Sequence, residues 1–269
     1  MSVGHYENFP VASALLPRSL RRPVSVIYRF ARTADDFADE GNLPAEQRLA
    51  LLDGYREELR RLESGVRVEA PLFRDLSEVI AAHRLPFKLF HDLLDAFSQD
   101  VTKLRYANFD EVLSYCRRSA DPVGRLMLHL YGEASEENFA QSDLICSALQ
   151  LINFWQDVEI DFRKNRIYLP QDDMARFGVK ENQIRSGDTS GGWTQLMQFQ
   201  TGRAQRMMLA GAPLAARLPG RIGLEIRAVV QGGLRILDKI EDARGDVFRR
   251  RPVLRAWDWP LLLLRAMTM

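Results

Sequence analysis

The stretch Gln150-Leu-Ile-Asn153-Phe-Trp-Gln-Asp157-Val-Glu-Ile-Asp161 decides the fold. Asn153, Asp157 and Asp161 recur every four residues, and each step of four advances about 40° around an α-helix, so the three polar side chains share one stripe. The neighbouring residues are apolar: Leu149, Ile152, Phe154, Trp155 and Ile160. Unpaired carboxylates on a buried helix are costly. The stretch therefore predicts a buried helix whose carboxylates either bind a metal ion or pair with arginines of another helix.

The same helical period extends along the chain in both directions from this stretch. The expected helices cover Pro23–Glu40, Ala45–Leu62, Leu72–His83, Phe87–Val101, Phe109–Ala120, Ser135 to about Lys164, Trp193–Leu218 and Ile222–Ala243. Pro23 suits a first helical turn, and Asn108 followed by Glu111 predicts a capping box.

Signals for β-structure are missing from the sequence. It has no alternating strand pattern longer than a few residues and no Asn-Gly or Asp-Gly hairpin turn. Gln171–Gly192, rich in glycine and serine, is expected to be a surface excursion between helices. We therefore expect a single all-α domain over residues 1–269.

Composition narrows the class of protein further. The 269 residues are 46% hydrophobic and 27% charged, which is typical of a soluble globular chain. Lys plus Arg number 37 against 36 acids, so no excess of cations favours nucleic acid as the main partner. Cys116 and Cys146 cannot form a disulfide framework or a zinc site alone. Without a visible secretory signal or spanning segment, a cytoplasmic protein is expected, at most resting against the inner face of the membrane.

A second acidic cluster, Asp35-Asp36-Phe-Ala-Asp39-Glu40, precedes the deciding stretch. On a helix Asp35 and Asp39 share a face, about 6 Å apart along the axis. Like charges at that spacing repel by about 0.2–0.5 kcal/mol, and a cation between them would reverse the sign. Alone, the cluster is typical of a solvated helix end. Two carboxylate-bearing helices in one bundle favour the metal interpretation.

The ligand chemistry points to Mg²⁺, with Mn²⁺ as an alternative. None of the four histidines has a glutamate three residues before it, which argues against a di-iron carboxylate site. The predicted metal ligands are Asp35, Asp36, Asp39, Asn153, Asp157 and Asp161. Basic residues beside them (Arg32, Arg163, Lys164 and Arg166) favour a diphosphate. A nucleotide is disfavoured because neither Gly-x-x-x-x-Gly-Lys nor Gly-x-Gly-x-x-Gly occurs.

From about His5 to the last helix, the sequence resembles the squalene/phytoene synthase family of head-to-head isoprenoid enzymes. Three motifs carry the resemblance: Tyr28-x-x-x-Arg32-x-x-Asp35-Asp36-x-x-Asp39, Gln150-x-x-Asn153-x-x-x-Asp157-x-x-x-Asp161 and Arg166-Ile-Tyr-Leu-Pro170. The resemblance implies an isoprenoid-synthase helical bundle with a central substrate tunnel. It also implies catalytic roles for Asp35, Asp39, Asn153 and Asp157, and substrate binding by Tyr28, Arg32, Gln150, Arg163 and Arg166.

Two departures from the family pattern bear on the reaction. Arg117 and Arg118 stand where the family usually carries a further tyrosine implicated in catalysis, and His5 and Asn8 lie where many members have a serine-rich, phosphate-contacting stretch. These departures resemble the hydroxysqualene synthase branch of bacterial hopanoid biosynthesis, often called HpnC. That branch is implied to ionise presqualene diphosphate and end the cation with water, giving hydroxysqualene without NADPH.

The roles of the departing residues stay open at this point. Arg117, the candidate catalytic group of this helix, could position the terminating water, hold diphosphate, or pair structurally with Asp121 or Glu111. Arg118, His5 and Asn8 are expected to bind substrate.

Two other functions stay open. One is a sibling prenyl transferase that makes presqualene diphosphate, squalene or phytoene. The other is a non-catalytic helical protein that binds polyprenyl diphosphates, which the two intact acid motifs disfavour. Neighbouring pathway enzymes are further possible partners. At the C-terminus, Arg249–Arg251, Trp257, Trp259 and Leu261–Leu264 predict either a helix docked on the bundle, which we favour, or contact with an anionic bilayer.

Overall fold

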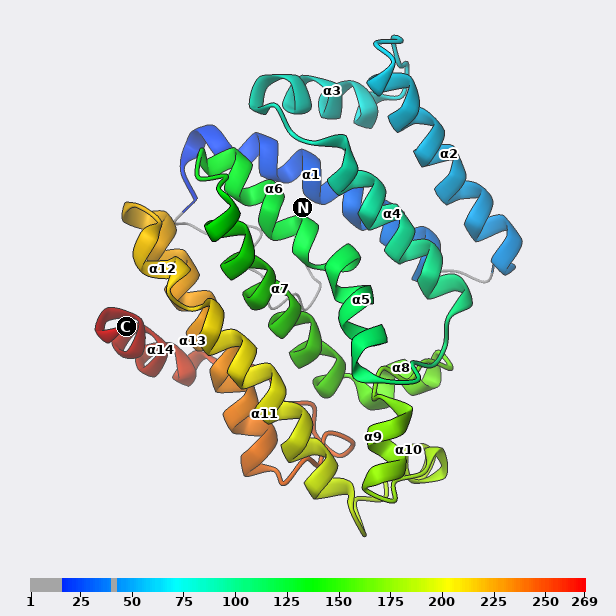
Figure 1. The fold of residues 1–269 in the computed structure, drawn as a ribbon, viewed down its shortest axis with the longest axis vertical. Coiled ribbons are helices and arrows are strands. Elements are labelled where there is room, and N and C mark those ends of the chain that lie inside the picture. The colour runs from blue at the N-terminus through cyan, green and yellow to red at the C-terminus, as the bar shows by residue number, and fades with distance from the viewer. Residues whose placement is uncertain (1–15, 40–42) are drawn as a thin grey trace.

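A computed structural model describes residues 16–39 and 43–269, apart from the side chain of Thr268. The chain folds into helices that run roughly side by side (Figure 1). Within the described residues, the one β-type pairing is an isolated bridge between Arg105 and Ile167. The all-α prediction is therefore confirmed.

The helices follow one another along the chain in two groups. Those before the acidic stretch at 150–161 are α1 (Arg18–Asp39), α2 (Ala45–Glu63), α3 (Pro71–His83), α4 (Phe87–Thr102), α5 (Phe109–Ser119) and α6 (Asp121–Tyr131). Those that contain or follow it are α7 (Glu136–Gln156), α8 (Val158–Arg163), α9 (Gln171–Arg176), α10 (Glu181–Ser186), α11 (Trp193–Gly211), α12 (Leu214–Arg217), α13 (Gly220–Asp242), the 3₁₀ turn η1 (Ala256–Asp258) and α14 (Trp259–Thr268).

Two apolar clusters form the core. One is built mainly from α1 to α4, and the other from α5, α7, α11, α13 and the segment around Ile167. Helix α6 belongs to both, because Leu126 and Leu130 face the first cluster and Leu128 faces the second. Helix α4 also reaches both, through Ala96. The clusters thus share elements, and the single domain over residues 1–269 stays a prediction.

The structure corrects the expected start of the first helix. Helix α1 begins at Arg18, so Pro23 lies inside the helix instead of in its first turn. Proline removes one helical hydrogen bond, but Pro23, Val24 and Ile27 are all buried, and their packing holds the helix across that position. The stated boundary Glu40 lies outside the described residues.

Helix α6 was not expected from the sequence. It begins at Asp121, directly after the Ala120 that caps α5, and Pro122 occupies its first turn. Proline at that position is compatible with a helix start. The predicted helix end at Ala120 thus lies at the cap of α5, and a second helix follows it at once.

The long helix expected from Ser135 to about Lys164 is divided at Asp157. This residue has φ −104° and ψ 14°, which ends α7 and starts α8. The helix expected over Trp193–Leu218 is likewise divided, at Ala212 and Pro213. The excursion at Gln171–Gly192 contains the short helices α9 and α10.

The cap predicted at Asn108 is half confirmed. Its side chain accepts a hydrogen bond from the Glu111 backbone N–H at 3.0 Å. The Glu111 carboxylate, however, accepts from the Ala107 N–H at 2.8 Å instead of from the Asn108 N–H.

Close approach of α11 to α7 generates a prediction about stability. A Cβ at Gly211 would lie 2.6 Å from the Gln141 carbonyl oxygen, so the backbones would have to separate. We expect Gly211→Ala to lower the free energy of unfolding by about 1–3 kcal/mol in chemical denaturation. The control is Gly54→Ala on α2, where a Cβ meets nothing within 4 Å, and which should raise that free energy by about 0.5–1 kcal/mol. Equal effects of the two changes would contradict this account of the packing.

Candidate active site

The first acid motif lies in the second half of α1. Arg32 donates to Asp35 at 3.2 Å and pairs with Asp36 at 2.8 Å. Burial, the negative charge of Asp39 and that of Asp100 raise the pKa of Asp35 to about 7, although Arg32 opposes the shift. The carboxylates of this motif therefore repel one another in a poorly solvated place, which is the setting that a bound cation relieves.

Asp39, at the end of α1, connects the two acid motifs. The buried guanidinium of Arg166 donates to one of its oxygens, and Lys164 donates to the other at 2.8 Å. Burial favours a raised pKa for Asp39, but the charges and hydrogen bonds of Arg166 and Lys164 outweigh it and lower the pKa below its usual range. Asp39 thus remains a carboxylate at neutral pH.

The second acid motif spans the break between α7 and α8. Asp161 is half-buried, and burial together with the charge of Asp157 raises its pKa well above the usual range. The charges of Arg166, Asp39 and Lys164 also act on Asp161. The two motifs therefore meet around Arg166 instead of lying on separate surfaces.

Asp157 has a partner that the sequence did not reveal. Arg251 pairs with both of its oxygens, with Nη2 at 3.0 Å from Oδ2. Beside it, the Gln156 side chain donates to the Pro252 carbonyl at 2.6 Å. The arginine run before the C-terminal helix is thus partly internal, and it holds the second motif in place.

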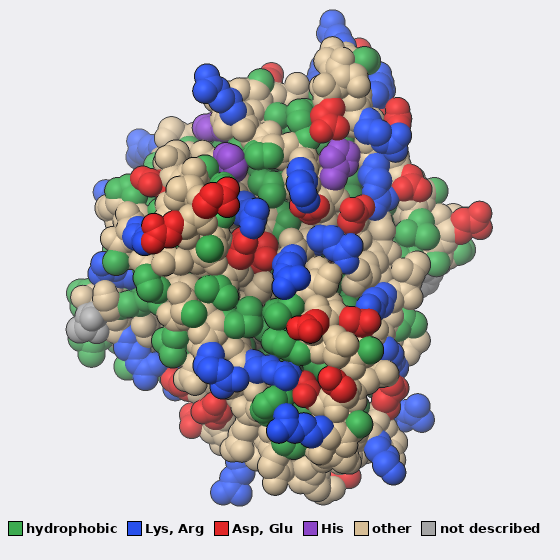
Figure 2. Space-filling model, viewed as in Figure 1, with side chains coloured by type: hydrophobic (Ala, Val, Ile, Leu, Met, Phe, Trp, Pro, Cys, Tyr) green, Lys and Arg blue, Asp and Glu red, His purple; other side chains and the backbone are tan. Residues whose placement is uncertain are grey.

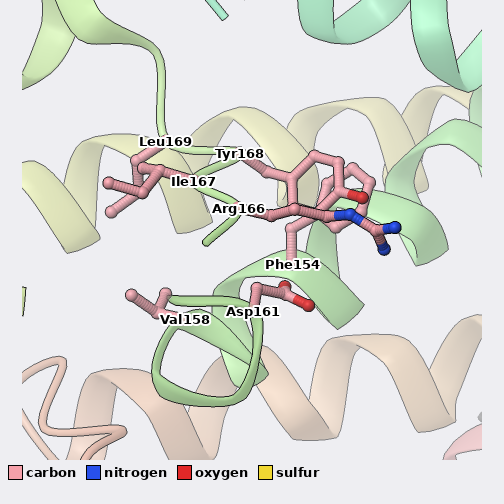
Figure 3. A pocket seen from close by; sticks show the side chains of 7 residues that line it. All are labelled: Phe154, Val158, Asp161, Arg166, Ile167, Tyr168 and Leu169. Carbon is pink, nitrogen blue, oxygen red and sulfur yellow. The ribbon is translucent and has the colours of Figure 1, made fainter. Parts of the chain in front are cut away.

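A crevice lies directly under this junction. It is lined by residues of α7, α8 and the following segment: Phe154, Val158, Asp161, Arg166, Ile167, Tyr168 and Leu169. Its interior leaves no volume for a water molecule. Figure 3 shows the Arg166 side chain running beside the rings of Phe154 and Tyr168, with the Asp161 carboxylate below. These two rings stack face to face with centroids 3.7 Å apart.

A buried carboxylate with two tyrosines was missed by sequence reasoning. Asp100 on α4 is 4% exposed and accepts hydrogen bonds from Tyr115 at 2.6 Å and Tyr168 at 3.0 Å. Burial raises the pKa of Asp100 to about 6, while Tyr115, Arg166 and Tyr168 act in the opposite direction. Tyr106 packs against both tyrosine rings. The only sequence signal was an isolated acid on an apolar helix face.

The two arginines of α5 have different surroundings. Arg118 donates to the Gln99 side chain at 2.6 Å, and Gln99 in turn donates to the Tyr106 hydroxyl at 3.1 Å. The Arg118 Nε is buried without a hydrogen-bond partner among the described residues. Arg118 is therefore linked to the aromatic cluster and has one donor left over.

Arg117 instead lines an open groove of about 460 Å³ between α4, α5, α6 and α7, together with Asp121, Arg125 and Ser147. Figure 2 shows acidic and basic side chains mixed over this face. Arg125 pairs with Asp143 there, and Asp121 accepts from Ser147 at 2.8 Å. The geometry favours Arg118 over Arg117 as the arginine of the site.

The remaining predicted residues lie at varying distances from this centre. Tyr28 on α1 and Gln150 and Asn153 on α7 are half-buried. Arg163 pairs with Glu159 on the outer side of α8, with its side chain 74% exposed. His5 and Asn8 lie outside the described residues. The substrate roles of all these residues, and the central tunnel, stay predictions.

The donor atoms fit Mg²⁺ in kind, because the carboxylates of Asp39 on α1 and Asp161 on α8 both interact with the charge of Arg166. No three His, Cys, Asp or Glu side chains of the described residues are grouped closely enough to hold a metal ion by themselves. Mg²⁺ commonly takes one or two carboxylates and fills its other positions with water and substrate phosphate oxygens. Asp35, Asp36, Asp39 and Asp161 therefore offer the oxygen ligands that Mg²⁺ takes together with water and phosphate, and their role as metal ligands stays a prediction.

Comparisons with known proteins show the family of the chain. The family model described as squalene/phytoene synthase matches residues 3–258. The hydroxysqualene synthase of Rhodopseudomonas palustris is 39% identical over 225 residues, which are 83% of this chain and 75% of that protein. The hydroxysqualene synthase of Zymomonas mobilis is 36% identical over 233 residues, covering 85% and 76%.

A solved structure agrees as well. The crystal structure of the squalene synthase HpnC from Alicyclobacillus acidocaldarius superposes with a TM-score of 0.83 at 37% identity. The match covers 89% of this chain and 90% of that one.

The groove generates a prediction about pH. Burial raises the pKa of Asp121 to about 7, so the folded protein holds a proton that the unfolded chain releases near pH 4. Stability contributed by this group is therefore lost as pH rises from about 4 to about 7. The parent should lose this stability between about pH 5 and about pH 8, whereas Asp121→Asn, which has no carboxyl group to titrate, should not. In thermal or chemical melts, the free energy of unfolding of Asp121→Asn should therefore rise by about 2–3 kcal/mol relative to that of the parent over this pH range. The prediction is contradicted if the difference in free energy of unfolding between Asp121→Asn and the parent is the same at both pH values. It is also contradicted if Asp242→Asn, at an exposed site, shows the same gain.

Proposed function

The chain belongs to the squalene/phytoene synthase family, and we propose that it is a hydroxysqualene synthase. In the proposed reaction the C–O bond of presqualene diphosphate breaks, and its electron pair leaves with diphosphate. The cyclopropylcarbinyl cation rearranges, water adds to it, and a proton is released. One observation carries the proposal: the two acid motifs meet around Arg166. They lie next to the aromatic cluster, the group of tyrosine rings whose hydroxyls donate to Asp100.

Diphosphate binding is the first task of the site. Arg32 and Lys164 both lie within hydrogen-bond distance of the α1 acids, so their charges are available where a diphosphate would sit beside those acids. When bound to the carboxylates of Asp35, Asp39 and Asp161, Mg²⁺ would neutralise the charge that develops on the leaving diphosphate.

Containment of the cation is the second task. Phe154, Tyr168, Tyr106 and Tyr115 form a stacked group whose ring faces attract positive charge and exclude water. The Tyr115 and Tyr168 hydroxyls are fixed by donating to Asp100. We propose that the terminating water is held near Arg118, whose Nε has no other partner among the described residues.

The lipid nature of the substrate bears on the location and the partners that we propose for the protein. None of the described helices has both the length and the apolarity needed to cross a bilayer. A cytoplasmic protein that rests on the inner face of the membrane, beside other enzymes of its pathway, is consistent with a lipid substrate.

Incubation with presqualene diphosphate and Mg²⁺ tests the function. We expect release of diphosphate and formation of hydroxysqualene, with no requirement for NADPH and with loss of turnover after chelation of the metal. Recovery of unreacted presqualene diphosphate would reject the proposal. Products made from farnesyl diphosphate alone would instead identify a condensing prenyl transferase.

The acid motifs can be tested separately. Asp35→Ala and Asp161→Ala should each lower turnover of presqualene diphosphate by at least about 100-fold, because each removes a carboxylate placed to bind the metal. Asp242→Ala, an exposed acid at the end of α13, serves as the control, and circular dichroism checks that every variant is folded. Activity like that of the parent in either variant would count against the metal assignment.

The two arginines of α5 provide a second test. Arg118→Gln should lower turnover roughly 10- to 100-fold, because it removes a charged donor beside the aromatic cluster. Arg117→Gln should have the smaller effect, since this side chain lines the outer groove. A larger loss in Arg117→Gln would reverse the assignment.

A further inference from the structure

The last helix concentrates the exposed apolar surface of the protein. Eleven large hydrophobic side chains are markedly exposed among the described residues, and five of them lie between Trp257 and Met267. These five side chains, Trp257, Trp259, Leu263, Leu264 and Met267, are each at least 50% exposed. Hydrophobic side chains also reach the surface at the edge of Figure 2 where α14 lies. We call this group the terminal apolar face.

Helix α14 is apolar on two sides. Leu262 and Ala266 are 1% and 0% exposed, and α14 packs on α13. Arg265 and Asp238 pair at 3.1 Å between the two helices. By helical geometry, the side chains of the terminal apolar face that belong to α14 cover an arc of about 140°, and this arc carries no charge. The face is thus exposed although the helix itself is firmly docked.

The dimensions of the helix exclude crossing a membrane. Its ten residues span about 15 Å, half the thickness of a hydrocarbon core. A helix of this kind, with tryptophans on its apolar side, is suited to lie in the plane of a bilayer surface. Tryptophan is favoured at the boundary between headgroups and acyl chains.

Arginines are frequent in the segment that carries the face. Residues 244–269 contain six arginines and two aspartates. Arg249, Arg251 and Arg265 pair with Asp246, Asp157 and Asp238. Arg255 lies 4.9 Å from the centre of the Trp257 ring. Asp258, the residue after Trp257, is 1% exposed and is neutralised by Arg235 at 2.9 Å and Lys239 at 2.6 Å.

We propose that the terminal apolar face docks the protein on an anionic lipid bilayer, with α14 parallel to the surface and Arg255, beside Trp257, against the headgroups. Burial of the five side chains and attraction of the cations act together in such docking. A second copy of the chain is a poorer occupant, because it would bring a second Arg255 against the same face without an exposed acid of the face to pair with it. The proposal is independent of which isoprenoid diphosphate the protein converts.

Intrinsic fluorescence can report this docking directly. Trp155 and Trp193 are fully buried, so Trp257 and Trp259 are the tryptophans that can enter lipid. Vesicles of phosphatidylcholine containing about one third phosphatidylglycerol should shift the emission to shorter wavelength, and brominated acyl chains should quench it. The protein should bind vesicles of pure phosphatidylcholine at least roughly tenfold more weakly. Salt at about 0.5 M should reverse most of its binding to the anionic vesicles.

Matched variants separate the apolar and the charged contributions. Leu263→Gln together with Leu264→Gln should weaken partition into the anionic vesicles at least roughly tenfold. Leu209→Gln on α11 should not, although Leu209 is 52% exposed like Leu263. Arg255→Gln should reduce binding and its salt dependence, whereas Arg67→Gln, at a side chain 85% exposed elsewhere, should change neither.

Three results would overturn the proposal. They are unaltered tryptophan emission with anionic vesicles, equal binding of the Leu263→Gln/Leu264→Gln and Leu209→Gln variants, and a dimer in sedimentation velocity that the Leu263→Gln change dissociates. None of these measurements involves turnover, so a failure here is distinguishable from a failure of the proposed reaction.

Discussion

The ion pair between Arg166 and Asp39 is the contact on which the site depends. Arg166 is 7% exposed, and its partner lies 127 residues earlier in the chain. A buried guanidinium is tolerated only when a carboxylate compensates it, and removing either partner leaves an unpaired buried charge. This pair fixes the end of α1 to the segment after α8. It thereby fixes the first acid motif relative to Asp161 and to the aromatic rings beside Tyr168.

Much of the fold could be predicted from hydrophobic period alone, because long amphipathic helices repeat their apolar positions. One error occurs where that period continues across a change of backbone, since at Asp157 the apolar pattern runs on although the chain turns. Helix α6 was missed for a different reason, because Asp121-Pro122-Val-Gly124 at its start is typical of a turn. Pro23 shows the reverse, since tertiary packing holds a helix across a residue that disfavours it.

The acid motifs of the site could be predicted because their spacing is local and their chemistry is unusual for a buried helix. Asp100 and Arg251 could not, because each becomes significant only through a partner distant in sequence, Tyr115 and Tyr168 for the one and Asp157 for the other. Sequence reasoning chose Arg117 as the catalytic candidate and Arg118 for substrate binding, although their adjacent positions do not reveal which way each side chain points. In the structure, the Arg117 side chain lines the outer groove, whereas the Arg118 side chain is linked to the aromatic cluster through Gln99.

The clamp on the second acid motif has a consequence for folding. Arg251 and Pro252, which hold Asp157 and Gln156, lie 94 and 96 residues later in the chain. Bringing such distant segments together costs conformational entropy that their contacts repay only after they have met. The break between α7 and α8 therefore acquires its final geometry late in folding, when the segment after α13 closes over it.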